Sequence, residues 1–121
     1  MDERLVPAEV FDQMVRDAID ALPAWVAPLV DEMAVSVENL PDKVQPPGHT
    51  LLGLYRGVPR TRYGGRPAGS LPDAITLYPL PILSMCNEPA DVPQRVLKVL
   101  GHEVGHSLGL SDDRLRELGW Y

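Results

Sequence analysis

The chain has 121 residues, a length that fits one globular domain. Its net charge of -6 argues against nucleic acid or an anionic membrane as the main partner, because both need a basic protein surface. No apolar run approaches the roughly 20 residues that span a bilayer, and the acidic start MDERLVPAEV is unlike a signal peptide. Cys86 is the only cysteine, which excludes an internal disulfide and predicts a reducing, cytoplasmic location.

The N-terminal part of the chain is predicted to be helical. Apolar residues recur with a helical period from about Pro7 to Leu22, Pro7 suits a first helical turn, and Pro23 ends the helix. The following stretch, 24–33, is expected to form a short helix or turn that Pro28 interrupts.

The middle of the chain is predicted to supply a short mixed sheet of about three strands, at 33–40, 49–57 and 74–80. Pro79 and Pro81 indicate that the third strand lies at an edge of the sheet or ends there. With the helices, these strands predict an α+β fold in which residues 1–121 form a single small domain.

The stretch 56–70, RGVPRTRYGGRPAGS, contains four arginines and no acidic residue. One interpretation is a solvated loop, since loops are polar and exposed. The other is a mobile flap that helps to hold an acidic or extended substrate.

The stretch DVPQRVLKVLGHEVGHSLG predicts a mostly enclosed helix over 91–108, with Asp91 as its N-cap. His102 and His106 are four residues apart, so they share one helix face and both rings can bind one metal ion. Glu103 lies about 100° round the helix from His102. It is poorly placed as a third ligand on that side but can accept a proton from a metal-bound water, as the general base of a zinc hydrolase does. The alternative is a pair of histidines without a metal.

These residues resemble the zincin metallopeptidases. The extended metzincin pattern HExxHxxGxxH/D is matched at each position, by His102, Glu103, His106, Gly109 and Asp112. The ending HEVGHSLGLSDDRLRELGW is similar to that of bacterial minimal zincin-like metallopeptidases, over roughly 70–121. The resemblance implies a zincin-like domain that binds Zn2+, with His102, His106 and Asp112 as ligands and Glu103 as the catalytic base. It also implies peptide or protein substrates, whose peptide bonds a metal-activated water hydrolyses.

The third ligand has alternatives. Gly109 suits a helix end with positive φ, after which the chain reverses and a residue three positions on can return to the metal. Ser111 is also a natural N-cap for a final helix, and Asp112 and Asp113 would stabilise the dipole of its first turn. The third ligand is therefore Asp112, Asp113 or water.

Two departures from the metzincin pattern affect the functional interpretation. No methionine follows Met85, and only a short helix and Trp120-Tyr121 stand where a C-terminal subdomain normally forms one wall of the cleft. The alternative function is therefore a catalytically weak or inactive zinc-containing module that binds peptides or proteins. A further alternative is an enzyme whose cleft is completed by self-association or by a protein partner.

Three smaller expectations concern the surroundings of the site. The strand at 74–80 is the candidate edge for binding an extended peptide by strand addition. Tyr63 and Tyr78 are candidates for oxyanion stabilisation. Gly101 and Gly105 each cost about 1 kcal/mol relative to alanine in a helix, so they are expected to allow close approach of another backbone, from the first or the terminal helix.

Overall fold

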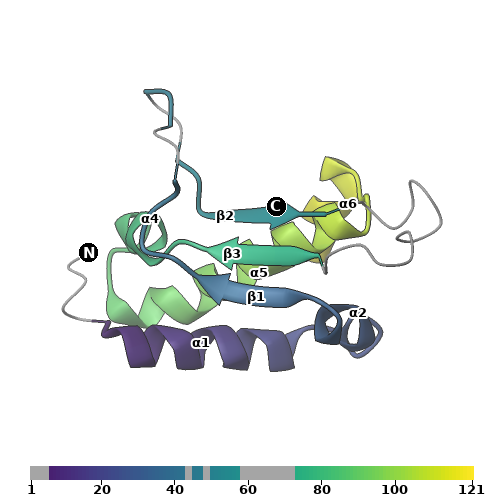
Figure 1. Cartoon of the computed structure of the whole chain (residues 1–121), viewed down its shortest axis with the longest axis horizontal. Coiled ribbons are helices and arrows are strands. Elements are labelled where there is room, and N and C mark those ends of the chain that lie inside the picture. The colour runs from purple at the N-terminus through teal and green to yellow at the C-terminus, as the bar shows by residue number, and fades with distance from the viewer. Residues whose placement is uncertain (1–5, 43–44, 48–49, 58–72) are drawn as a thin grey trace.

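A three-stranded mixed sheet forms one layer of the protein (Figure 1). The computed structural model describes residues 6–42, 45–47, 50–57 and 73–121. The strands are β1 (Ala34–Val37), β2 (Gly53–Arg56) and β3 (Ala74–Leu77), in the spatial order β1-β3-β2. β1 runs parallel to β3, whereas β2 is antiparallel to it. The predicted α+β class with a short mixed sheet is confirmed.

β3 is the central strand, so the prediction that the third strand lies at an edge is wrong, whereas the alternative that the strand ends at the following prolines is confirmed. Ile75, Thr76 and Leu77 are buried in succession, and β3 has a paired strand on each side. Pro79 does not disturb the strand pairing, because it lies at the first position of the next helix, α4 (Pro79–Ser84). The edges are β1 and β2, and β2 is the edge that lies beside the helix carrying the histidines.

The helices form the second layer. Their bounds are α1 (Ala8–Ala21), α2 (Ala27–Asp31), α4 (Pro79–Ser84), the 3-10 turn η2 (Pro89–Asp91), α5 (Val92–Ser107) and α6 (Asp112–Leu118). α1 buries Phe11, Val15 and Ala18 and packs against α5, which in turn contacts β2 and β3. Pro28 lies in the first turn of α2 and so begins a helix instead of interrupting one. No helix within the described ranges is long and apolar enough to cross a membrane.

The first turn of α5 differs from the prediction. Asp91 has helical backbone angles and its side chain does not cap α5. Instead Asp91 ends η2, where its carboxylate accepts a hydrogen bond of 3.2 Å from the backbone N–H of Glu88. The arginine-rich stretch predicted as a loop or flap lies outside the described residues beyond Gly57.

The end of α5 follows the prediction closely. Gly109 has φ 69°, a left-handed conformation that glycine adopts without strain, and the chain reverses there. Ser111 then caps α6, because its Oγ accepts a hydrogen bond of 3.2 Å from the backbone N–H of Arg114. Asp112 and Asp113 occupy the first turn of α6.

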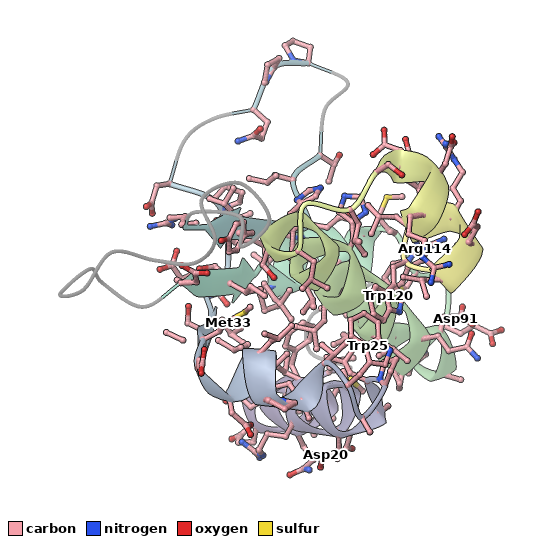
Figure 2. All side chains as sticks on the ribbon, turned by 90° about the vertical axis from the view of Figure 1, so that its right-hand side faces the viewer. Asp20, Trp25, Met33, Asp91, Arg114 and Trp120 are labelled. Atoms are coloured by element: carbon pink, nitrogen blue, oxygen red, sulfur yellow. The ribbon has the colours of Figure 1, made fainter. Side chains whose placement is uncertain are left out.

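The two glycines within α5 are covered by side chains that come from α6 and the residues after it, instead of by another backbone. A Cβ atom on Gly101 would lie 2.6 Å from the ring of Trp120, and one on Gly105 would collide with the side chain of Leu115. Both covering side chains are buried, and they anchor the C-terminal part of the chain to α5. Figure 2 shows Trp120 beside this helix.

Candidate metal centre

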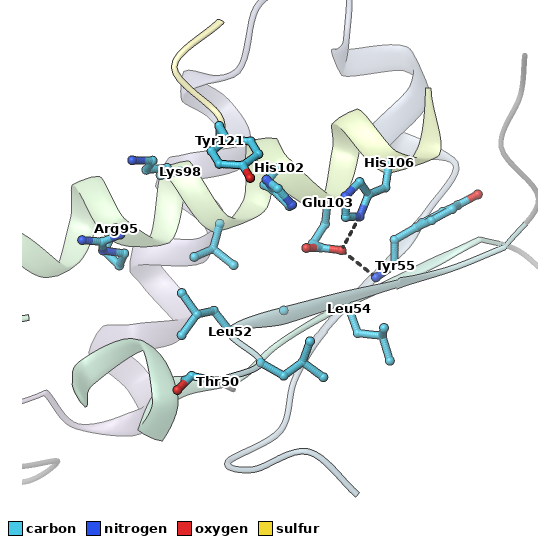
Figure 3. A pocket seen from close by; sticks show the side chains of 13 residues that line it. Thr50, Leu52, Leu54, Tyr55, Arg95, Lys98, His102, Glu103, His106 and Tyr121 are labelled. Carbon is cyan, nitrogen blue, oxygen red and sulfur yellow. Dashed lines mark hydrogen bonds and ion pairs between the residues drawn. The ribbon is translucent and has the colours of Figure 1, made fainter. Parts of the chain in front are cut away.

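A groove of about 350 Å³ is lined by β2 and by the exposed face of α5 (Figure 3). β2 and the residues just before it form one wall, and α5 forms the other. The lining residues are Thr50, Leu51, Leu52, Gly53, Leu54, Tyr55, Arg95, Lys98, Val99, His102, Glu103, His106 and Tyr121. The groove therefore places both histidines and the glutamate of the HExxH motif beside the edge strand of the sheet.

His102, Glu103 and His106 form the one cluster of metal-ligating side chains within the described ranges. One donor atom from each lies within 4.8 Å of the others. The two imidazole rings meet edge to face, with their centroids 4.4 Å apart. This follows from the helical repeat, because positions 102 and 106 differ by just over one turn of α5.

Both histidines have one ring nitrogen engaged by a hydrogen-bond acceptor. His102 Nδ1 lies 2.9 Å from the carbonyl oxygen of Trp120. A carbonyl can only accept, so Nδ1 carries the proton and Nε2 keeps its lone pair. His106 Nδ1 lies 3.2 Å from Oε1 of Glu103, and donation to this carboxylate likewise leaves Nε2 of His106 as an electron-pair donor. Metal-ligating histidines are oriented in this way, so the donor set fits a metal such as zinc.

Glu103 is buried, with 6% of its surface exposed, and its carboxylate is held from the opposite wall. Its Oε1 accepts a hydrogen bond of 2.9 Å from the backbone N–H of Tyr55 on β2. This bond, with the contact to His106, offsets the cost of burying a carboxylate. The side chain is therefore held in place inside the groove.

Close contact between β2 and α5 makes the bond to Glu103 possible. A Cβ atom on Gly53 would lie 2.9 Å from Cγ1 of Val99 and 3.3 Å from Cγ of Glu103, so a larger residue would push the strand away. The Tyr55 hydroxyl donates to Oδ2 of Asp73 at 3.0 Å, which further fixes the end of β2. Sequence reasoning did not identify Tyr55, because it lies 48 residues from Glu103 along the chain.

The C-terminal residues contribute to the same groove. The ring of Tyr121 lies 5.9 Å from that of His102, and the Arg116 guanidinium lies 4.0 Å above the Tyr121 ring. Tyr121 thus supplies a short wall next to the histidines, while Trp120 is buried and contacts His102 through its carbonyl oxygen.

Asp112 is exposed in the first turn of α6 and is not part of the three-residue donor cluster. Asp113, the alternative ligand, is also exposed and pairs with Arg116 at 3.2 Å.

Tyr78 is buried and does not line the groove, so it is not placed for oxyanion stabilisation there. Tyr63 lies outside the described residues. Met85 is half exposed and also does not line the groove.

Comparison with known proteins adds one finding. The sequence model of a family described as zincin-like metallopeptidase matches residues 30–120. The match extends from the end of α2 to Trp120 and includes all three residues of the donor cluster. Among curated proteins, no significant match to the chain is found.

Proposed function

The chain belongs to the zincin-like metallopeptidase family, and we propose that it is a zinc-dependent peptidase that hydrolyses peptide bonds in the groove between β2 and α5. The observation that carries the proposal is the convergence of His102, Glu103 and His106, with Nδ1 of each histidine already engaged by an acceptor. Two imidazoles on one helix face and a carboxylate beside them can supply two metal ligands and the general base of a zinc hydrolase.

His102 and His106 would hold the zinc ion through Nε2, and we propose Asp112 as the third protein ligand. Asp112 follows the chain reversal at Gly109 and forms no hydrogen bond or ion pair with another described residue, so its carboxylate is available. When bound, zinc would polarise a scissile carbonyl and lower the pKa of a water molecule towards neutrality.

Glu103 would act as the general base. Its carboxylate would accept a proton from the attacking water and pass that proton to the departing amine. The hydrogen bond from the Tyr55 backbone to Oε1 restricts rotation of the side chain and leaves Oε2 for this proton transfer. Tyr55 is therefore a positioning residue, acting through its main chain.

β2, instead of the strand predicted from sequence, is the proposed edge for an extended peptide. The N–H of Tyr55 points away from β3 towards Glu103, and the two-residue repeat of a strand turns the backbone groups of Gly53 to the same side. Since the Tyr55 N–H is bound to Glu103, a peptide could add to β2 through the backbone groups of Gly53 and cross the groove in front of α5.

The test combines metal analysis with digestion of a peptide library by the purified protein. The wild type and Glu103→Gln should both bind about one zinc, whereas only the wild type should cleave peptides. Glu117→Gln is the matched control, because Glu117 is an exposed α6 residue paired with Arg114 at 2.8 Å. Zinc binding without cleavage by the wild type would contradict the peptidase and favour a peptide-binding module.

A further inference from the structure

Two cations line the groove of a protein that is acidic as a whole. Arg95 and Lys98 on α5 line one end of the groove, although the chain has a net charge of -6 (Figure 3). Glu103 is the one acidic residue among the described residues that line it. From this we propose that the groove selects peptides with a carboxylate close to the bond that is cleaved. This inference rests on the proposed peptidase function and specifies its substrate class.

The spacing of the two cations along α5 defines where the carboxylate would lie. At 100° per residue, Arg95 falls within about 20° of the direction of His102, and Lys98 within about 40°. At 1.5 Å per residue, Lys98 is about 6 Å and Arg95 about 10 Å along the helix from His102. An extended peptide advances about 3.3 Å per residue. The selected carboxylate is therefore two or three residues from the scissile bond.

Neither cation is neutralised by an acidic residue in the described part of the chain, although the Arg95 side chain also interacts with the Cys86 thiol. No ion pair joins Arg95 or Lys98 to a described acidic residue, even though Asp91 lies one turn before Arg95 on the same stretch of chain. Both charges are therefore available to a ligand in the groove.

The walls of the groove strengthen such a contact. Leu52, Leu54 and Val99 also line the groove, so a bound peptide would displace water from apolar surface. An ion pair that is partly shielded from solvent is stronger than one on an open surface. Positive charge in the groove would also attract an acidic peptide towards it, although the protein as a whole is acidic.

A matched set of labelled peptides tests the inference. The peptides share one cleavable sequence and carry Glu, Gln or Lys at the second or third residue on either side of the scissile bond. Each is made with a free and with an amidated C-terminus, which separates a side-chain carboxylate from a terminal one. Cleavage by the zinc-loaded wild type gives kcat/KM, and fluorescence anisotropy with Glu103→Gln gives the dissociation constant without turnover. We expect a carboxylate to improve both by about tenfold over the neutral peptide.

The variants Arg95→Gln, Lys98→Gln and their combination should remove that preference stepwise. Arg16→Gln is the control, because it makes the same charge change on α1, where Arg16 is exposed and hydrogen-bonded to Gln13. A preference that persists in the double variant, or equal binding of all peptides, would overturn the inference.

Cleavage without charge preference refutes the inference alone. Selective binding without cleavage supports the inference but refutes the peptidase, and neither binding nor cleavage refutes both.

Discussion

The carbonyl oxygen of Trp120 accepts a hydrogen bond of 2.9 Å from Nδ1 of His102. The indole of the same residue covers Gly101, one position before that histidine. A buried aromatic ring therefore fixes the main-chain group that orients a candidate metal ligand. The orientation of His102 depends in this way on residues that follow the last helix.

Replacing Trp120 with alanine should weaken both the fold and the metal site. Loss of a buried tryptophan costs about 3–5 kcal/mol of unfolding free energy, and loss of a group that orients a ligand costs about 10- to 100-fold in metal affinity. Chemical denaturation and zinc titration measure the two effects. Trp120→Phe keeps a ring over Gly101 and should retain most of the affinity.

Trp25→Ala is the matched control for this experiment, because Trp25 is 56% exposed whereas Trp120 is 7% exposed. The control should change the unfolding free energy by at most about 0.5 kcal/mol. Zinc affinity that is unchanged in folded Trp120→Ala would separate Trp120 from the orientation of His102.

Gly105→Ala should destabilise the protein although alanine is the better helix former. The new methyl group would collide with Leu115, which is fully buried and has little room to move. Overpacking costs about 1–3 kcal/mol, against about 1 kcal/mol gained from helix propensity. Denaturation of Gly105→Ala, Leu115→Val and the double variant forms a cycle, in which the double variant should be more stable than the sum of the single effects predicts. Strict additivity would show that the two positions do not collide.

Asp112→Ala should lower zinc affinity, if the carboxylate acts as the third ligand, whereas Asp113→Ala should not. The two residues are neighbours in the first turn of α6 and both are exposed, so they lose the same helix-dipole interaction when replaced. Asp113→Ala also loses the ion pair with Arg116 at 3.2 Å, so it perturbs α6 at least as much, and a lower zinc affinity in Asp112→Ala alone reports ligation. Equal affinities in both variants and the wild type would remove Asp112 from the ligand set.

Cys86 should react slowly with thiol reagents in the native protein. Burial raises the pKa of its thiol, so less thiolate is present near pH 8 than in the unfolded chain. The pKa of the Cys86 thiol is higher in the folded protein than in the unfolded chain. Its contribution to the free energy of unfolding is therefore fully present below the unfolded pKa and is lost as the pH rises through the folded pKa. Alkylation rates in buffer and in denaturant, with Cys86→Ser as the blank, measure the difference. Equal rates in both would contradict the burial of this thiol.

Local patterns were sufficient to predict most elements and the motif. Helical periodicity identified α1 and α5, and single residues with strong local preferences, Gly109 and Ser111, correctly marked the end of one helix and the start of another. The spacing of the HExxH motif predicted that the histidines and the glutamate would meet, because one helix carries all three. Such features depend on interactions within a few residues.

Relationships between distant segments could not be predicted in the same way. The order of strands in a sheet is decided by tertiary packing, which is why β3 was wrongly expected at an edge. The contacts of Tyr55 with Glu103 and of Trp120 with His102 join residues 48 and 18 positions apart. Arg95 and Lys98 could be placed on α5 from sequence, but their position in the groove depends on where β2 packs.

Removal and restoration of the metal test the central proposal most directly. Hydrolysis of one peptide is measured on a single preparation as purified, after a chelator has removed the metal, and after one equivalent of zinc has been added back. A zinc-dependent peptidase loses its activity on chelation and regains it with zinc, while His102→Ala and His106→Ala regain none. Full hydrolysis by the metal-free protein, or equal recovery in the histidine variants, would contradict a zinc site on α5.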